Sequence, residues 1–381
     1  MGISVLPPDV NESGLRFTPV PSGIRYGMAG VKGVGAAAVE AIIAERTKNG
    51  PYKGFVDFFE RTSVAGAVNK KAVESLIKAG AFDFTGLSRG RLFAGIEPAA
   101  SYAASVKRDR AAGQTSLFDM LAPDDAKASG LGMTDSDLPD APPWSRKDML
   151  AFEKELIGFY ISGHPLQDHL ETLSIYSQTT AADFQGLDER VRVRVGGLLT
   201  QERLVRTKPK EGSDEKPKPM LFFQIETPDG FIPAAAYTKA YEENSALLQP
   251  ETVLFFCGSV RLDRTGAGKM LSIDEVYPVD TAPSKFTQSI RLDIKKDTWT
   301  EERLQHLADV LRRHPGRTLV TLCLRMGDGD VYLRPNASEF SINVTEDLIR
   351  DCRTWADAVH ITPSAQPGLR TPEEPRWKKK Q

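Results

Sequence analysis

Val31-Lys32-Gly33-Val34-Gly35 is the stretch that decides how the first part of this 381-residue chain folds. Two glycines flank a small apolar residue directly before an alanine-rich segment, which predicts a tight hairpin leading into a helix. Glycines let backbone N–H groups approach a phosphate closely, and the start of a helix attracts anions. We therefore predict that Lys32, Gly33, Val34 and Gly35 bind the DNA backbone without reading its sequence. The alternative is a plain turn between two helices.

The sequence around this hairpin has a helical pattern from about residue 24 to residue 96. Apolar residues recur at i, i+3 and i+4 in two places, at Val39, Ile42 and Ile43 and again at Val73, Leu76 and Ile77. A second candidate half of the motif spans residues 69–84, with Asn69 as the expected N-cap and Gly80 as the expected stop. A helix-hairpin-helix domain is therefore predicted over residues 1–107.

Residues 108–144 lose the helical periodicity and are rich in Gly, Pro, Asp, Ser and Ala, which predicts a linker. Within it, Gln114, Leu117 and Phe118 form a short motif of one polar residue and two apolar anchors. The two anchors suit an apolar pocket, and the glutamine amide suits hydrogen bonds at its rim. The motif resembles the peptides that bind bacterial sliding clamps, so these three residues are predicted to bind a clamp.

A helical connector is predicted over residues 145–185 and an OB-type β-barrel over residues 186–282, where short apolar runs are joined by Gly- and Pro-containing turns. Basic residues gather near the first strands of this barrel, at Arg192, Arg194, Arg203, Arg206, Lys208 and Lys210. Bases stack on aromatic rings and phosphates bind cations, so this composition suits single-stranded DNA.

We predict that Arg203, Arg206, Lys208 and Phe222 contact that strand. The alternative is a solvated basic edge with the phenylalanines in the barrel core. Neighbouring side chains on a strand face opposite ways, so one member of the Phe222–Phe223 pair is expected in the core.

After residue 283 the order strand, helix, strand, strand, helix predicts a small α/β domain over residues 283–362. The Pro- and Lys-rich tail over residues 363–381 is predicted to be disordered. The chain as a whole is thus expected to be a multidomain α+β protein. Its formal net charge is −2, so any DNA contact must come from local basic patches.

No residue of this chain is predicted to be catalytic, and no metal or other cofactor is expected in it. The sequence has no Walker loop, no dinucleotide fingerprint and no zinc-binding histidine motif. His164 precedes Pro165 without a recognisable nucleophile or metal partner, so a structural turn is expected there. Neither a signal peptide nor a run of about 18 apolar residues is present, which favours a cytoplasmic protein without a membrane span.

Four segments resemble, in the same order, the alpha subunit of bacterial DNA polymerase III. They are Val5–Ser13, Ile24–Gly35, Leu76–Asp83 and Glu153–Leu166. The resemblance covers residues 1 to about 280. It implies a tandem helix-hairpin-helix domain that also binds the clamp, an OB domain, and a C-terminal domain that contacts the clamp-loader tau subunit. It also places Gln114, Leu117 and Phe118 at the family's internal clamp-binding motif.

In this family the polymerase chemistry uses aspartates of a palm domain that holds two Mg²⁺ ions. The palm would precede residue 1, so the resemblance implies a part that supports processive, template-directed DNA synthesis without carrying the active site. Two alternatives stay open. One is a fragment of the error-prone paralogue of the alpha subunit, and the other is a stand-alone accessory protein that binds DNA and is not an enzyme.

Overall fold

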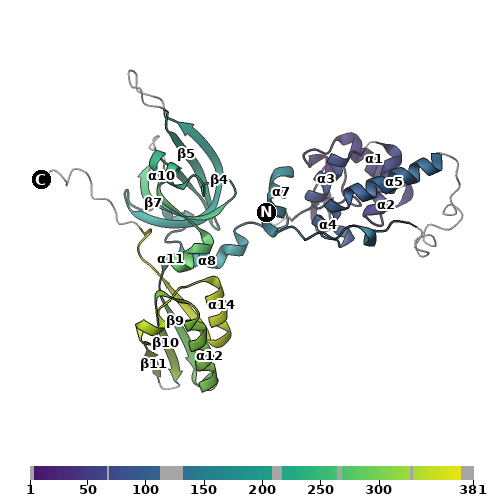
Figure 1. The fold of residues 1–381 in the computed structure, drawn as a ribbon. Helices are drawn as coiled ribbons and strands as arrows, with labels where there is room; N and C mark the ends of the chain where they lie inside the picture. Colours follow the sequence, from purple (N-terminus) through teal and green to yellow (C-terminus); the bar gives the residue numbers. More distant parts are fainter. Residues whose placement is uncertain are drawn as a thin grey trace. The chain divides into compact units, whose positions relative to one another are not determined.

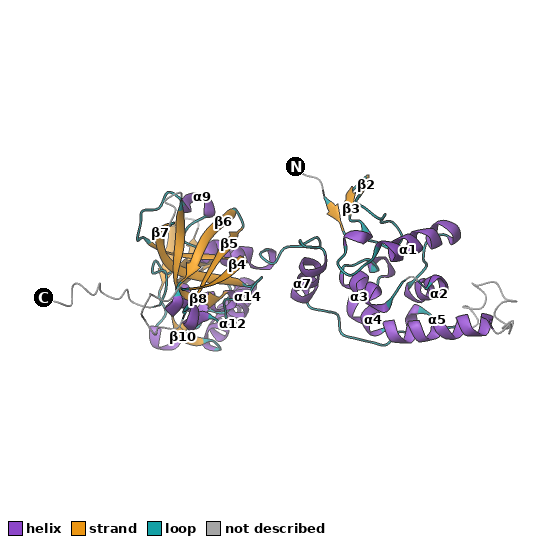
Figure 2. Cartoon of the chain, turned by 90° about the horizontal axis from the view of Figure 1, so that it is seen from above, coloured by secondary structure: helices purple, strands orange, loops and turns teal. Residues whose placement is uncertain are grey.

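The computed structural model describes residues 4–66, 68–111, 132–207, 217–263, 268–326 and 329–369. The chain divides into two compact units, residues 1–164 and residues 165–381. The first unit is mainly helical, and the second holds a closed β-barrel followed by a mixed α/β sheet (Figure 1; Figure 2). The predicted fold class, with a helical domain, an OB-type barrel and a small α/β domain, is confirmed.

Unit 1 opens with a small sheet in the order β1-β3-β2, formed by Val5–Leu6, Gly23–Arg25 and Thr18–Val20. Residue 24, expected to start a helix, lies instead in β3, because its backbone pairs with β1 and β2. A 3₁₀ turn over Met28–Gly30 follows. The helices are α1 (Ala36–Asn49), α2 (Phe55–Ala65), α3 (Lys70–Lys78), α4 (Arg89–Ala94), α5 (Ile96–Ala111) and α7 (Arg146–Leu156).

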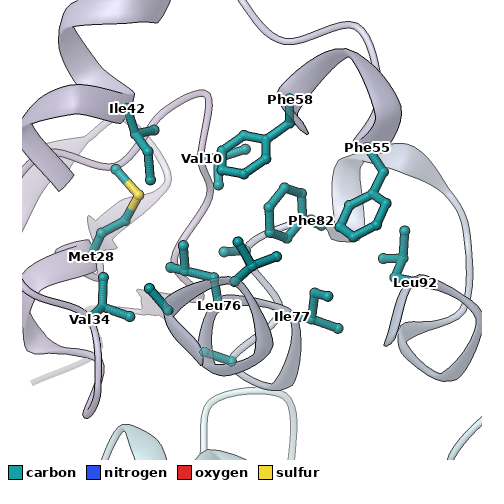
Figure 3. Packing of buried hydrophobic residues seen from close by; sticks show 14 of the residues in the cluster. Val10, Met28, Val34, Ile42, Phe55, Phe58, Leu76, Ile77, Phe82 and Leu92 are labelled. Atoms are coloured by element: carbon teal, nitrogen blue, oxygen red, sulfur yellow. The ribbon is translucent and has the colours of Figure 1, made fainter. Parts of the chain in front are cut away.

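The core of unit 1 joins the hairpin to the helices that follow it (Figure 3). Phe82 meets Phe55 and Phe58 edge to face, with ring centroids 5.2 and 4.9 Å apart. Val34 from the hairpin and Leu76 from α3 belong to the same buried cluster. Burial of these side chains therefore anchors the hairpin to the hydrophobic core of unit 1, while Gly33 and Gly35 stay exposed at the surface.

The last part of the predicted linker, from residue 132 on, packs on unit 1. Both carboxylate oxygens of Asp135 accept hydrogen bonds from the N–H groups of Phe55 and Val56, each at 2.8 Å. Asp135 thereby caps α2, whose own N-cap Gly54 has no side-chain hydrogen bond. A Cβ atom at Gly54 would lie 2.4 Å from the Asp135 carboxylate, so the glycine makes room for this cap.

The structure therefore differs from the predicted linker, 108–144, at both ends. Helix α5 extends to Ala111, and Leu138 is buried in the core of unit 1. The predicted connector 145–185 is likewise divided, because α7 belongs to unit 1 and the helices after residue 165 belong to unit 2. The motif residues Gln114, Leu117 and Phe118 lie outside the described residues.

Unit 2 begins with α8 (Leu170–Tyr176) and α9 (Ala181–Phe184), which lead into the barrel. The barrel strands are β4 (Arg192–Arg206), β5 (Pro219–Thr227), β6 (Gly230–Ala236), β7 (Val253–Leu262) and β8 (Lys269–Pro278). They close in the order β4-β5-β6-β8-β7, with β6 parallel to β8 and α10 (Thr238–Asn244) before β7. A five-stranded closed barrel with this crossover is an OB fold.

The α/β sheet follows α11 (Ala282–Phe286) and has the strand order β11-β10-β9-β12. Its elements are β9 (Thr287–Lys295), α12 (Glu301–Arg312), β10 (Pro315–Met326), β11 (Gly329–Leu333), α13 (Ala337–Phe340), α14 (Glu346–Trp355) and β12 (Ala358–Pro363). Apolar residues of α12 and α14, such as Leu307 and Leu348, form one core with Ile290 and Val320 of the strands. β9, α12, β10, β11 and α14 follow the predicted order, and the short helix α13 and the strand β12 are further elements that the sequence did not predict.

Arg194 is completely buried, so its grouping with the basic edge of the barrel was wrong. Its guanidinium stacks over the Phe286 ring at 4.0 Å. It donates hydrogen bonds to four backbone carbonyls, those of Tyr176 at 2.7 Å, Gln366 at 2.8 Å, Ser364 at 3.1 Å and Pro367 at 3.1 Å. Desolvation by burial lowers the pKa of this group, and the carbonyls keep it hydrogen-bonded as a cation.

The first residues of the tail predicted as disordered are therefore ordered, and that prediction was wrong for residues 364–369. Besides Arg194, the Cys257 thiol lies 2.8 Å from the carbonyl oxygen of Pro367, and burial raises the pKa of that thiol to about 12. The N–H of Leu369 donates to the Glu275 carboxylate at 3.1 Å. Side chains of β4, β7 and β8 thus hold this segment against the barrel.

Arg194→Met is expected to lower the free energy of unfolding of unit 2 by about 3 kcal/mol or more, since each buried carbonyl left without a donor costs roughly 1–3 kcal/mol. Urea denaturation followed by circular dichroism measures this change. Arg206→Met is the matched control, because Arg206 is exposed on the same strand and its loss should change stability little. Equal stability of the two variants would contradict the structural role of Arg194.

Candidate nucleic-acid interfaces

The hairpin of unit 1 requires a glycine at position 33 for two reasons. Gly33 has φ +89°, in the left-handed region that side chains disfavour. A Cβ atom there would also lie 3.0 Å from the Ser75 hydroxyl of α3. Lys32, Gly33 and Gly35 are exposed, whereas Val34 is buried. The structure thus brings Lys32 and both glycines together on one exposed turn, and the Val34 side chain anchors that turn in the core.

Backbone hydrogen bonds show which N–H groups of the hairpin are already used. Lys32 donates its N–H to the carbonyl of Leu156 at 2.9 Å, and Val34 donates to Val31 at 3.0 Å. Helix α1 starts after Gly35, an N-cap with no side-chain hydrogen bond. The first N–H groups of a helix have no partner inside the helix. The start of α1 therefore offers donors and the positive end of the helix dipole to an anion.

A second copy of this arrangement precedes α3. Helix α2 ends before Gly66, which has φ +66°, and α3 begins after Asn69. The two helices align residue by residue, Val39 with Val73, Glu40 with Glu74, Ile42 with Leu76 and Ile43 with Ile77. This repeat is the signal that was missed. Comparing the sequence with itself aligns α1 with α3 and indicates that the second half of the motif begins before residue 69, where the predicted half starts.

The two copies differ at the helix start. The Asn69 side chain accepts a hydrogen bond from the N–H of Ala72 at 2.8 Å, so α3 is capped from within. Gly35 supplies no such acceptor to α1. At the start of α3, an anion would therefore compete with the Asn69 side chain for a backbone N–H group, whereas at the start of α1 no capping side chain competes with it. Of the two turns, the one at residues 31–35 is the better candidate for a phosphate.

The barrel carries a groove of about 600 Å³ on the face formed by β4, β5 and β6, next to the connection between β7 and β8. In OB folds this face and these loops bind oligonucleotides. The residues of the lining that bear on binding are Gln201, Arg203, Phe222, Gln224, Asp263, Lys269 and Met270. Phe222 is half-buried on the groove side and Phe223 is in the core, as expected for neighbours on a strand.

A bulge in β4 determines the face of the barrel on which the Arg203 side chain lies. The β4–β5 register shifts between Thr200 and Arg203, and Gln201 has φ +52°. After the shift, Arg203 pairs directly with Phe222, so the two side chains share one face. On its other side, Phe222 pairs with Ala235 of β6, whose small side chain leaves space for the Phe222 ring. A cation and an aromatic platform thus meet in the groove.

The other basic residues of the barrel are placed differently. Lys269 lines the groove, but its ammonium donates to the carbonyl of Gln185 at 2.8 Å. Arg192 lies 3.4 Å from the Asp274 carboxylate and 3.5 Å from that of Glu275. Arg206 is exposed at the end of β4 and is not part of the groove lining, and Lys208 lies outside the described residues. The structure therefore unites Arg203 and Phe222, but not Arg206.

Neither a membrane helix nor a metal centre is found in the part of the chain that the structure describes. There, no helix is both long and apolar enough to cross a bilayer. Histidine, cysteine and carboxylate side chains likewise form no group of three or more that could hold a metal ion within those residues.

Residues 2–92 match the model of a family described as "Helix-hairpin-helix motif". The turn at residues 31–35 and the start of α3 both lie within the matched residues, and the chain continues into an OB barrel. Among solved structures, the second OB-fold domain of replication protein A from Methanococcus maripaludis is 11% identical, covers 25% of this chain and 89% of its own, and has a TM-score of 0.19. This score is low, so the assignment of the barrel rests on its own strand order.

The curated relatives define the family more closely. The DNA polymerase III subunit alpha of Mycobacterium tuberculosis strain H37Rv is 33% identical over 332 residues, which cover 86% of this chain and 27% of that protein. The same subunit of Neisseria meningitidis serogroup B is 34% identical and covers 76% and 24%. The chain belongs to the family of bacterial DNA polymerase III alpha subunits, as its motifs predicted, and it spans about a quarter of the length of these relatives.

Gly33→Ala is expected to lower the free energy of unfolding by about 1–2 kcal/mol, because a Cβ atom there is strained by the backbone and crowds Ser75. Gly35→Ser is the matched control. Gly35 has ordinary extended angles and open space around it, and a serine hydroxyl would cap α1. Chemical denaturation should rank Gly35→Ser at or above the parent chain, and a fully stable Gly33→Ala variant would contradict the need for glycine at position 33.

Proposed function

We propose that this chain is the DNA-holding and tethering part of a bacterial replicative DNA polymerase III alpha subunit. The observation that carries the proposal is the presence of an uncapped glycine turn and an Arg203–Phe222 groove in one chain related to that family. We assign no catalytic residue and no cofactor to it. Its role is to support template-directed DNA synthesis by a polymerase site that these residues do not form.

Duplex DNA is held at the turn of residues 31–35. A phosphate accepts hydrogen bonds from the free N–H groups at the start of α1, and the exposed Lys32 ammonium adds a charge. Contacts of this kind involve only the sugar-phosphate backbone, so they position the duplex without selecting a sequence. That property suits a protein that must move along any template.

Single-stranded DNA is held in the barrel groove. Its lining combines the Phe222 ring, the Arg203 guanidinium and the amides of Gln201 and Gln224. Base stacking on an aromatic ring contributes about 1–3 kcal/mol and tolerates every base. The described lining holds two cations, Arg203 and Lys269, and one carboxylate, Asp263, so its net positive charge is small. The groove therefore binds mainly by stacking, and its affinity depends only weakly on salt.

The same chain links the polymerase to other replication proteins. Gln114, Leu117 and Phe118 bind the sliding clamp, and the α/β domain after residue 283 contacts the clamp-loader tau subunit. A short peptide binds a clamp weakly, but attachment to DNA-bound protein raises its effective concentration and makes the contact persistent. Processive synthesis by a cytoplasmic replication complex follows from such linked weak contacts.

The two DNA sites are expected to respond differently to substitution. Lys32→Gln should weaken duplex binding and reduce the slope of log affinity against log salt by about one, because one phosphate contact is lost. Phe222→Ala should weaken single-strand binding about tenfold and leave that slope unchanged. Fluorescence anisotropy with labelled duplex and single-stranded DNA, at several salt concentrations, measures both effects on the full chain.

Two controls match these variants. Lys48→Gln removes the same charge from the exposed opposite end of α1, and Phe231→Ala removes an exposed ring of β6 that is not in the groove lining. Both should bind DNA like the parent chain. If Lys32→Gln and Lys48→Gln bind duplex DNA equally well, the turn is not the duplex site. If Phe222→Ala and Phe231→Ala bind single-stranded DNA equally well, the groove is not the single-strand site.

Combined replacement of Gln114, Leu117 and Phe118 by alanine is expected to abolish binding to the purified sliding clamp. The two apolar anchors and the rim hydrogen bond are lost together, while the fold, judged by circular dichroism, is kept. Surface plasmon resonance with immobilised clamp measures the affinity. An unchanged response would refute the assignment of these residues, and DNA binding of the same variant shows that its other surfaces are intact.

A further inference from the structure

The outermost strand of the α/β sheet has an edge whose centre is unprotected. Strand β11 (Gly329–Leu333) pairs with β10 on one side and is the last strand of its sheet (Figure 1). Three consecutive apolar residues on it are exposed, Val331 at 46%, Tyr332 at 55% and Leu333 at 45%. Proteins usually protect such an edge with charge, proline or a bulge. Here Asp330, Arg334 and Pro335 lie at the two ends of the edge, and only its centre, Val331–Leu333, has none of these features.

One face of this edge is apolar, and the other carries Tyr332 next to the Asp330–Arg325 ion pair. In the register with β10, Val331 lies beside Leu324 and Leu333 beside Leu322, on the face whose core is formed with the helices. Tyr332 lies beside Cys323 and so points to the opposite face. A strand added at this edge would therefore cover Val331 and Leu333 on one face and Tyr332 on the other while its backbone pairs with β11.

We propose that the occupant is a second copy of this chain, paired through its own β11 in antiparallel orientation about Tyr332. In that register the sequence complements itself. Val331 of each copy lies opposite Leu333 of the other, and the two Tyr332 side chains lie together. Asp330 of each copy lies opposite Arg334 of the other. Opposite charges and apolar pairs facing each other across strands stabilise a sheet, and a two-fold axis gives a closed dimer.

Neighbouring residues are compatible with this register. Arg334 is exposed and precedes Pro335, which holds its backbone extended. Asp330 forms an ion pair with Arg325 of its own chain, and a carboxylate accepts several donors at once. Arg325 is also bound to Asp293 at 2.7 Å, so it keeps a partner if Asp330 changes. The interface is small, which gives a dimer with a Kd on the order of 10 µM or weaker.

The test uses two single variants and their mixture. Arg334→Asp and Asp330→Arg each place like charges opposite each other in a self-paired dimer, so both should be monomeric. An equimolar mixture should restore the dimer, because each introduced charge then lies opposite its complement in the other chain. Sedimentation velocity of the full chain without DNA, over a wide range of concentration, measures the species. Rescue by mixing cannot result from two misfolded proteins.

The control is Arg350→Asp, which makes the same charge change at an exposed residue of α14. It should dimerise like the parent chain. A parent chain that stays monomeric at all concentrations overturns the proposal, as does a dimer that survives both single variants or a mixture that stays monomeric. DNA and clamp binding do not enter this experiment, so its result is independent of the function proposed above.

Discussion

Unit 2 depends on one buried guanidinium. Arg194 takes its place on β4, reaches the last turn of α8 and binds the carbonyls of Ser364, Gln366 and Pro367, which follow the final strand of the α/β sheet. A buried cation is costly unless its donors are satisfied, and here backbone carbonyls from two distant segments satisfy them. Arg194 therefore connects the barrel, the helix before it and the end of the described chain, and Cys257 and Glu275 add further contacts to that end.

In unit 1, a carboxylate rather than a guanidinium joins segments that are distant in sequence. The Asp135 carboxylate caps α2 from a segment that follows residues 112–131, the range that contains the proposed clamp-binding motif. Both flanks of that range, the end of α5 and the segment around Asp135 and Leu138, lie on the helical unit. The described residues on either side of this range thus belong to the same compact unit as the proposed duplex site at residues 31–35.

The proposed division of labour follows from the distribution of charge. The chain as a whole has a net charge of −2. Its proposed duplex site relies on N–H groups at the start of α1 with one lysine, and the cations of its groove, Arg203 and Lys269, are partly offset by Asp263. Neither surface creates a large positive field. Weak contacts that leave the DNA free to slide, linked to a clamp and to other subunits, fit a replication protein better than a tight binder.

The sequence alone predicted what local rules determine. Helical spacing located α1 and α3, the turn at residues 31–35 identified the hairpin, and alternation placed Phe223 in the core with Phe222 outside. It could not separate Arg203 from Arg194, because both are arginines on the same strand and only the bulge in β4 and the burial of one of them distinguish their surroundings.

Tertiary structure decided which segments meet. The Asp135 cap joins residues about 80 positions apart, and the Arg194 contacts join residues about 170 apart. Local sequence propensity does not indicate contacts between segments so far apart. For this reason residues 132–144 were predicted as part of a linker and residues 364–369 as part of a disordered tail. Composition and periodicity report how a segment folds with its neighbours in sequence, whereas the hydrogen-bonding demand of buried polar groups is met by whatever the finished fold brings close.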